Sequence, residues 1–330
     1  MPEPSASPQP KRHRRFWLWA PYVAVLAALV AWSGVWLAMS LRTQSELNDR
    51  AKALRARGYA ASWSGMKVDG WPFRLDLTLT QPRFGEPSGW AVAAPVLKGE
   101  SMPYTPGRWI LVAPEGLTLT RPGKGPLAVA GRAIRASVGG LDTPQPRFSF
   151  EGLDLSLSPA PGGQPTAFSA ADRLEMHLQP GPDDQAALLV RVEDAKLEPS
   201  TNLARLATTL DLTWDSRLSH LSALRGRDWP SAVQAWTAAG GAMTMANAKI
   251  ALGGLALEGA GGSLTVGPDG RLRGAAPMTV RKGGGLNLGG LHLGGVTVGG
   301  LSFSGPMPLK FEDGRVWFGA FPIGPALKVY

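Results

Sequence analysis

Between Phe16 and Leu41 the chain runs for 26 positions without a charged side chain. A helix of about 20 apolar residues is long enough to cross the hydrocarbon core of a bilayer. Aromatic residues, which favour the two membrane interfaces, gather near both ends of the run, at Trp17, Trp19, Tyr22 and Trp36. The sequence therefore predicts a single transmembrane anchor at 16–41.

The charges around this run predict its orientation. Four basic residues stand directly before it, at Lys11, Arg12, Arg14 and Arg15. The basic residues after it are dispersed and are partly offset by Glu46 and Asp49. The positive-inside rule then places the N-terminus in the cytoplasm and exports the rest of the chain. A cleaved signal peptide, with Ala38 and Ser40 before the cut, is the alternative, but its apolar region would span only about 7–15 residues.

The next segment, Gln44 to Arg57, has the pattern of a short amphipathic helix. Apolar residues recur at the spacing of one helical face, at Leu47, Ala51 and Leu54. Thr43 and Glu46 fit a capping box at its start, and Gly58 fits its end. We expect a stalk helix over 42–58. Two positions for it stay open: along the membrane surface, or packed on the folded domain.

From Tyr59 onward, apolar and polar residues alternate with a period of two. In the segments 75–80, 117–120 and 153–158 every second residue is Leu. Such alternation is typical of antiparallel strands with one buried and one solvated side. Two dipeptides between such segments predict hairpin turns, Asp269-Gly270 and Asp313-Gly314. The expected fold is mainly β: a large antiparallel domain, as a curved sheet or two layers, with one or two helices.

The segment from Leu218 to Ala239 interrupts this alternation. Four residues after Pro230 share one helical face, namely Ala232, Val233, Trp236 and Ala239, and they predict one helix, with a break at Trp229-Pro230 left open. The helix divides the strands into two sets, which form either two similar β layers or two subdomains. The predicted organisation is a cytoplasmic basic tail at 1–15, the anchor at 16–41, the stalk at 42–58, an N-terminal β part at 59–217, the helical interruption at 218–240 and a Gly-rich β part at 241–330.

Residues 286–305 form a five-residue repeat, LNLGG, LHLGG, VTVGG and LSFSG. A solenoid needs several stacked coils to bury its core, and these units are short and few. Strands punctuated by glycine are therefore the expected structure here.

The net charge of +9 does not indicate a nucleic-acid-binding protein. Residues 1–57 carry nine Lys/Arg and three Asp/Glu, a net +6, which leaves +3 for residues 58–330. A nucleic-acid-binding domain carries its basic stripe on the folded part, whereas here the excess flanks the apolar run and would meet anionic lipid head groups. The absence of Cys excludes disulfides, thiolate metal sites and cysteine nucleophiles.

No group of residues predicts catalysis, a metal site or a cofactor. None of the histidines has a second ligand at metal-binding spacing on a predicted helix; they are His13, His177, His220 and His292. No phosphate-binding or nucleophile-elbow motif is present. Structural or solvating roles are expected for the acidic pairs Asp183-Asp184, Glu193-Asp194 and Glu312-Asp313, since neighbours on a strand point to opposite faces. We expect a protein that is not an enzyme.

One motif is singled out as the candidate ligand site: Gly70, Trp71, Pro72, Phe73 and Arg74. Two bulky aromatic residues surround a proline immediately before a clearly alternating strand. The structural interpretation is an aromatic lid on the core. The functional interpretation places Trp71, Phe73 and Arg74 at the mouth of an apolar groove, with Arg74 facing a lipid phosphate.

Several features recur together in one known family. They are the single N-terminal span, the helix end LRARGY at 54–59, Trp63, the motif at 70–74, the segment GSLTVGPDGRLRG at 262–274 and LKFEDGRVWFGAFPIG at 309–324. In this combination the chain resembles a bacterial envelope family catalogued as domain of unknown function 2125. The resemblance implies a protein anchored in the inner membrane with a periplasmic domain, and it implies no activity. The strand pair at DGRLRG is also similar, at the level of the fold alone, to repeats of large envelope proteins with lipid-holding β-grooves.

Three functions are compatible with these features. The first is a binding or carrier module whose apolar inner face accepts lipid acyl chains close to the membrane. The second is a structural or assembly scaffold that acts through contacts with envelope proteins, which predicts a filled core and exposed apolar patches. The third is a hydrolase of envelope lipid or polysaccharide, which predicts a cleft with two perturbed carboxylates. The expected partners are the membrane and either lipid or envelope proteins, without nucleic acid.

Overall fold

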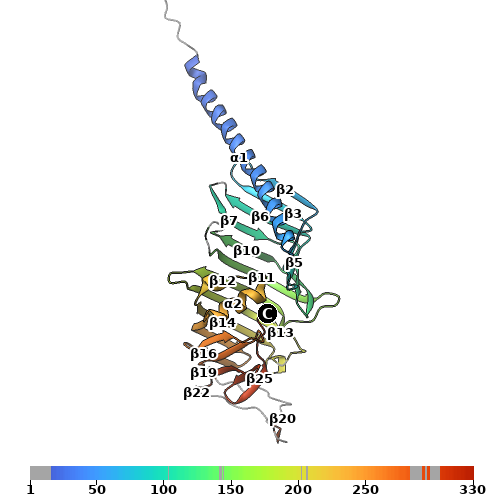
Figure 1. Ribbon diagram of the computed structural model, residues 1–330, viewed down its shortest axis with the longest axis vertical. Coiled ribbons are helices and arrows are strands. Elements are labelled where there is room, and N and C mark those ends of the chain that lie inside the picture. Colours follow the sequence, from blue (N-terminus) through green and yellow to red (C-terminus); the bar gives the residue numbers. More distant parts are fainter. Residues whose placement is uncertain are drawn as a thin grey trace, which may run out of the picture.

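The computed structural model describes residues 16–102, 104–140, 143, 145–201, 203–205, 207–282, 292–293, 296–297 and 305–330. One long helix, α1 (Phe16–Ala56), projects from a curved antiparallel sheet (Figure 1). The upper part of α1 has a window of mean hydropathy 2.0, of which only 6% is buried. By length and composition this helix can cross a membrane. The mainly β fold with an N-terminal apolar helix is confirmed.

The predicted stalk is not a separate helix. α1 continues without a break from the apolar run to Ala56, and Gly58 follows with a φ of +86°. The capping box at Thr43 was therefore wrong, because the preceding apolar residues already belong to the helix and satisfy its N–H groups. Ala51 is buried and Leu47 packs on the core beside β3. Of the two positions predicted for the segment 42–58, the structure shows the one in which it packs on the folded domain.

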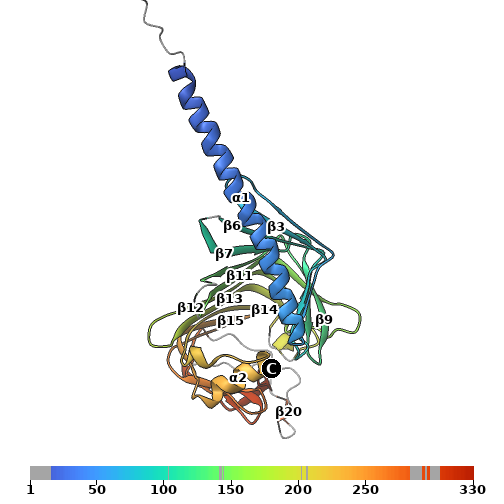
Figure 2. The same cartoon turned by 45° about the horizontal axis from the view of Figure 1, so that its top comes forward.

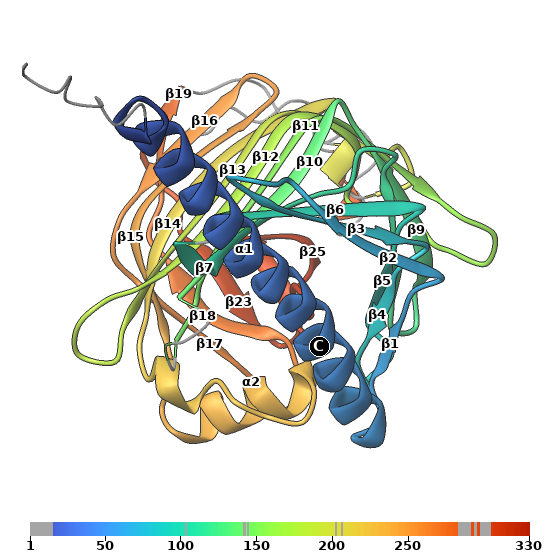
Figure 3. The same cartoon turned by 90° about the horizontal axis from the view of Figure 1, so that it is seen from above.

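Five long strands form the middle of the sheet, and each pairs antiparallel with the next. They are β11 (Arg147–Pro159), β12 (Phe168–Pro180), β13 (Ala186–Leu197), β14 (Thr209–Leu218) and β15 (Met243–Leu252). Together they curve into a trough that is concave on the side of α1 and α2 (Figures 2 and 3). This trough determines where a ligand could lie.

Toward the N-terminus the sheet divides into two branches, because both β10 and β9 pair with β11. The first branch consists of β10 (Ala133–Gly139), β7 (Thr105–Val112), β6 (Val96–Met102), β3 (Leu75–Thr80) and β2 (Gly65–Asp69). The second consists of β9 (Gly125–Ala130), β8 (Leu117–Arg121), β5 (Ala91–Ala93), β4 (Arg83–Gly85) and β1 (Ala60–Ser62). The lower part of α1 contacts both β1 and β2 and so lies between the branches (Figure 3).

Toward the C-terminus the sheet divides again, since β15 pairs with both β16 and β17. One branch consists of β16 (Leu255–Gly259), β19 (Thr279–Lys282) and β22 (Gly305–Pro306). The other consists of β17 (Ser263–Val266), β18 (Leu272–Ala276), β23 (Leu309–Glu312), β24 (Arg315–Phe318) and β25 (Phe321–Pro325). Within the predicted repeat at 286–305, β20 (His292–Leu293) pairs with β21 (Val296–Thr297), and apart from Gly305 the other repeat residues lie outside the described part of the chain.

The local β predictions are confirmed. In β3 the residues Leu75, Leu77 and Leu79 are buried, whereas the residues between them are at least partly exposed. Asp269-Gly270 joins the paired strands β17 and β18, and Asp313-Gly314 joins β23 and β24. Both Asp313 and Gly314 have positive φ angles, as a tight two-residue hairpin turn requires.

The predicted helix at 218–239 is shorter than expected. Leu218 ends β14, the 3-10 turn η2 (Leu221–Ala223) follows, and α2 (Trp229–Ala238) begins at the proposed break; a second 3-10 turn, η1 (Leu203–Arg205), precedes β14. Asp228 caps α2 by accepting a hydrogen bond from the Ser231 N–H at 3.0 Å. Three of the four predicted face residues are buried, Ala232, Val233 and Trp236. Ala239 is exposed because it already stands at the helix end.

The helix also does not separate two β layers. β14 and β15, which it connects, are hydrogen-bonded neighbours from Leu218↔Met243 to Leu210↔Leu252. The sheet therefore continues past the helix, and α2 lies against its concave side (Figure 2).

Candidate functional site

A cavity of about 920 Å³ lies between the lower part of α1 and the concave side of the sheet. This cavity is called the α1 groove below. The helix contributes residues from Met39 to Arg50, and the sheet contributes residues of β3, β6, β7, β10 and β11. Its volume is near the upper end of the range of about 300–1,000 Å³ that is typical of small-molecule sites. Met39 stands at the end of the uncharged run, so the groove begins where the apolar part of α1 ends.

The wall of the α1 groove follows from the alternation in the sequence. Leu75, Leu77 and Leu79 of β3 face it, together with Trp109 and Leu111 of β7. Their neighbours on the same strands point to the other face, since successive side chains alternate; on β3 these neighbours are polar. The sheet thus presents an apolar surface to the space beneath α1.

An apolar row continues from the groove across the concave face. Six neighbouring strands place an apolar, half-buried residue at the same register: Leu111, Ala136, Phe150, Met176, Val190 and Trp214. Adjacent strands are about 4.8 Å apart, so the row is about 24 Å long. At its far end the indole N–H of Trp214 is buried without a hydrogen-bond partner among the described residues.

Three arginines stand at the margin of the α1 groove. Arg42 pairs with Glu46 at 2.7 Å on the same helix face, and Arg135 pairs with Glu151 on the sheet. Arg50 forms no ion pair with any residue that the structure describes. Of these three cations, Arg50 therefore has its charge free for an anionic group.

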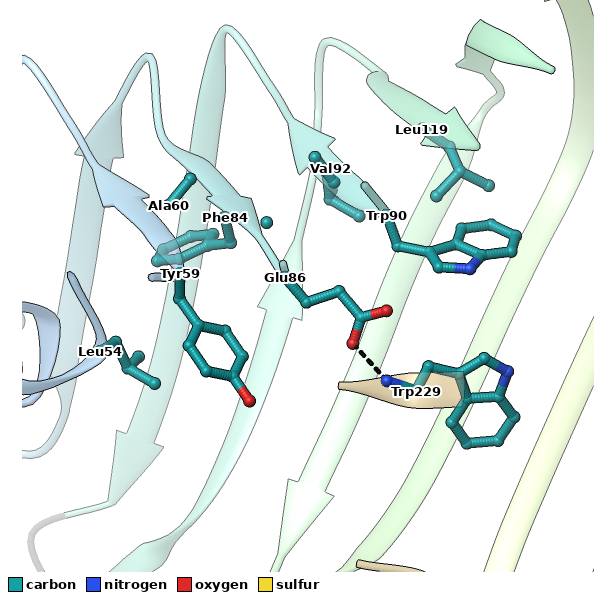
Figure 4. A pocket seen from close by; sticks show the side chains of 11 residues that line it. Leu54, Tyr59, Ala60, Phe84, Glu86, Trp90, Val92, Leu119 and Trp229 are labelled. Atoms are coloured by element: carbon teal, nitrogen blue, oxygen red, sulfur yellow. Dashed lines mark hydrogen bonds between the residues drawn. The ribbon is translucent and has the colours of Figure 1, made fainter. Parts of the chain in front are cut away.

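A second cavity of about 520 Å³ adjoins the first, because Phe84 and Val92 line both (Figure 4). It ends at a contact between segments far apart in the sequence. Glu86 accepts a hydrogen bond from the Trp229 N–H at 2.9 Å, and the Tyr59 hydroxyl donates to the Arg227 carbonyl. These two bonds join the second N-terminal branch to the start of α2.

The motif at 70–74 forms the loop between β2 and β3, and none of its residues lines either cavity. It contacts α1 above the groove instead, where the indoles of Trp32 and Trp36 donate to its carbonyls. The Arg74 guanidinium lies 3.7 Å from Asp76 and 3.6 Å from Glu100. Trp36 is one helical turn before Met39, so the loop stands just above the mouth of the groove.

Two carboxyl groups among the described residues have a shifted pKa, and in both the pKa is lowered. The Ser222 hydroxyl and N–H lower the pKa of Asp184, and hydrogen bonds from Ser231 lower the pKa of Asp228. A general acid needs a raised pKa, and these carboxylates serve a turn and a helix cap. No group of three or more His, Asp or Glu that could hold a metal occurs in the part of the chain that the structure describes.

The remaining acidic and histidine candidates lie in ion pairs, on a strand or beside turns. Glu193 lies 3.9 Å from Arg173, and Asp194 binds Lys196 at 2.6 Å. His177 is half-buried on β12, and His220 precedes η2 with its ring 3.2 Å from the Ser219 hydroxyl. Glu312-Asp313 leads into the β23–β24 turn, and His13 lies outside the described residues.

Fold and groove together define a class of protein: a single apolar helix that continues into a curved antiparallel sheet and covers an apolar groove. The model of the family described as "Uncharacterized protein conserved in bacteria (DUF2125)" matches residues 36–326, so the chain belongs to this family. The match spans the lower part of α1, the loop at 70–74 and the whole sheet, and it confirms the resemblance. No curated protein and no solved structure matches the chain.

Proposed function

We propose that this protein is a non-enzymatic binding module of the bacterial envelope that holds the acyl part of a lipid in the α1 groove. α1 anchors it in the inner membrane with the N-terminus in the cytoplasm, and the sheet lies in the periplasm. The observation that carries the proposal is the apolar cavity of about 920 Å³ that begins where the uncharged part of the helix ends.

The position of the groove suits a lipid that leaves the adjoining leaflet. Its walls are mainly Leu, Val, Phe and Trp side chains, which would replace the hydrocarbon surroundings of an acyl chain without loss of hydrogen bonds. Beyond Phe150 the row continues over Met176, Val190 and Trp214, which extends this apolar surface by about 14 Å. The whole row of about 24 Å has a length that suits an extended chain. The free guanidinium of Arg50 is suited to a head-group phosphate, which it can bind through two N–H donors.

The scaffold function predicts a filled core, and the open groove speaks against it. A scaffold would use apolar patches on the outside of the sheet. Apart from the loop at 70–74, the exposed large apolar side chains of the sheet are instead scattered over several strands and loops, for example at Met102, Ile110 and Leu327. Single exposed apolar residues are normal.

Site-specific photo-crosslinking in living cells tests the proposal. The photoreactive residue p-benzoylphenylalanine is placed at Leu111, which faces the groove, and separately at Ile110, the next residue on the other face of β7. Ile110 is 40% exposed and Leu111 faces the open groove, so both full-length variants should fold. Cells are labelled with radioactive phosphate before irradiation, and the purified protein is examined for covalently attached phospholipid.

We expect phospholipid adducts at Leu111 and few or none at Ile110. Equal labelling at the two positions would mean general contact with the membrane, and absence of label at both would mean an empty groove; either result overturns the proposal. Protein adducts at Ile110 without lipid at Leu111 would favour the scaffold function.

A further inference from the structure

The loop at 70–74, called the aromatic loop below, exposes unusually large apolar side chains. Trp71 is 52% exposed and Phe73 is 74% exposed, although both belong to a short turn between two ordered strands. An aromatic lid on the core would bury these rings. Their exposure in the isolated chain needs another explanation.

The aromatic loop is tied to α1 at one height by indole and hydroxyl groups. Trp32 Nε1 donates to the Pro72 carbonyl at 2.8 Å, and Trp36 Nε1 donates to the Arg74 carbonyl at 2.8 Å. Trp71 Nε1 donates in turn to the Ser33 hydroxyl at 3.2 Å. These bonds join residues about 40 positions apart, so the height of the loop along the helix is fixed by the structure.

That height lies inside the membrane-spanning part of α1. The hydrocarbon core takes about 20 helical residues, and the uncharged run has 26. The part of α1 within the hydrocarbon core of the bilayer can therefore begin no later than Tyr22 and end no earlier than Val35. In every placement Trp32 and Ser33 lie within the core, and Trp36 lies within it or at its boundary.

Several backbone groups of the aromatic loop have hydrogen-bond partners within the protein. A polar backbone group in a bilayer must find a partner within the protein. The Phe73 and Arg74 N–H groups donate to the Gly70 carbonyl at 3.2 and 2.9 Å, and Pro72 has no N–H. The two indoles of α1 satisfy the Pro72 and Arg74 carbonyls, which no strand of the sheet reaches.

We propose that the aromatic loop is inserted into the outer leaflet of the bilayer that α1 spans, with Trp71 and Phe73 among the lipid chains. The sheet then sits directly on the membrane, and the mouth of the α1 groove opens at the lipid surface. The Arg74 guanidinium is turned to Asp76 and Glu100, which offset its charge near the membrane. The inference rests on the membrane anchor of the proposed function and does not require a lipid in the groove.

Because the chain has no Cys, single cysteines can carry an environment-sensitive fluorophore without background. The full-length variants Val25→Cys, Phe73→Cys and Leu327→Cys are labelled and reconstituted into phospholipid vesicles. All three side chains are more than half exposed, at 60%, 74% and 64%. Val25 reports insertion of the helix, and Leu327 is the matched apolar control after β25. Quenchers attached at known depths of the lipid chains are then added.

We expect the label at Phe73 to emit at shorter wavelength than the label at Leu327 and to be quenched most strongly by shallow quenchers. The label at Val25 should respond to deep quenchers and the label at Leu327 to none. Quenching at Val25 without quenching at Phe73 would overturn the insertion of the aromatic loop. Absence of quenching at Val25 would overturn the inference through its premise, since the helix would then not span the membrane.

Discussion

Replacing Ala136 by Trp distinguishes an open groove from a packed core. Ala136 stands on β10 between Leu111 and Phe150, and it lines the α1 groove. If the groove is open, the new indole fills it and stabilises the fold. If the space is already filled, the same indole is forced into packed side chains.

The size of the effect follows from the apolar area. A buried Trp side chain removes about 150–250 Å² from water, which at about 25 cal/mol per Å² corresponds to about 4–6 kcal/mol. Ala136 is half-buried, so about half of this gain applies, and ordering the side chain costs about 1 kcal/mol. We expect a net stabilisation of about 1–2 kcal/mol, which raises the unfolding midpoint by about 2–8 °C.

The midpoint is measured by thermal unfolding of the full-length chain in detergent micelles. Ser137→Trp is the matched control, because the next residue of β10 points to the other face and should shift the stability by no more than about 0.5 kcal/mol. A loss of about 1–3 kcal/mol in Ala136→Trp, the usual effect of overpacking, would refute an open groove and the lipid proposal with it.

Three further changes follow from other contacts. Gly70→Ala places a Cβ 2.7 Å from a backbone carbonyl oxygen at a φ of +98°, so it should destabilise the aromatic loop by about 1–3 kcal/mol; Gly34→Ala, with nothing within 4 Å of its Cβ, is the control in chemical unfolding. Trp236→Ala removes a side chain that is 6% exposed and should cost about 3–5 kcal/mol in the same assay. The lowered pKa of Asp184 means that its hydrogen bonds with Ser222 stabilise the fold above the unfolded pKa of about 3.9 and are lost as the pH falls through the lower folded pKa. Urea unfolding between pH 5 and 2 should show a smaller acid loss in Asp184→Asn, and an unchanged loss would contradict this assignment.

The candidate motif at 70–74 shows how far the sequence alone leads. Its two aromatic residues beside a proline marked it as unusual, but its position against Trp32 and Trp36 depends on contacts across about 40 residues. No local pattern encodes that contact. Only part of the groove can be predicted from the sequence. The alternation predicts that the leucines of β3 lie on a buried face, but it does not predict that they lie opposite α1.

The missed features have the same origin. The stalk was expected as a separate helix because Thr43 and Glu46 fit a cap, yet a cap pattern has no effect where a helix already precedes it. The helix at 218–239 was expected to divide the strands, yet strand pairing passes behind it from β14 to β15. In both cases a local sequence pattern is outweighed by the structure around it: by the helix that precedes Thr43, and by the pairing of β14 with β15.

By itself the sequence determined the elements whose cause is local: the long apolar helix, the alternating strands and the turns at Asp269-Gly270 and Asp313-Gly314. Each depends on side-chain periodicity or on a φ angle that only a few residues adopt. The tertiary structure alone decided which strands are neighbours, how the sheet forks and curves, and that α1 covers an open groove. These depend on register between distant strands, where apolar faces match in many ways and only the packing of the whole chain selects one.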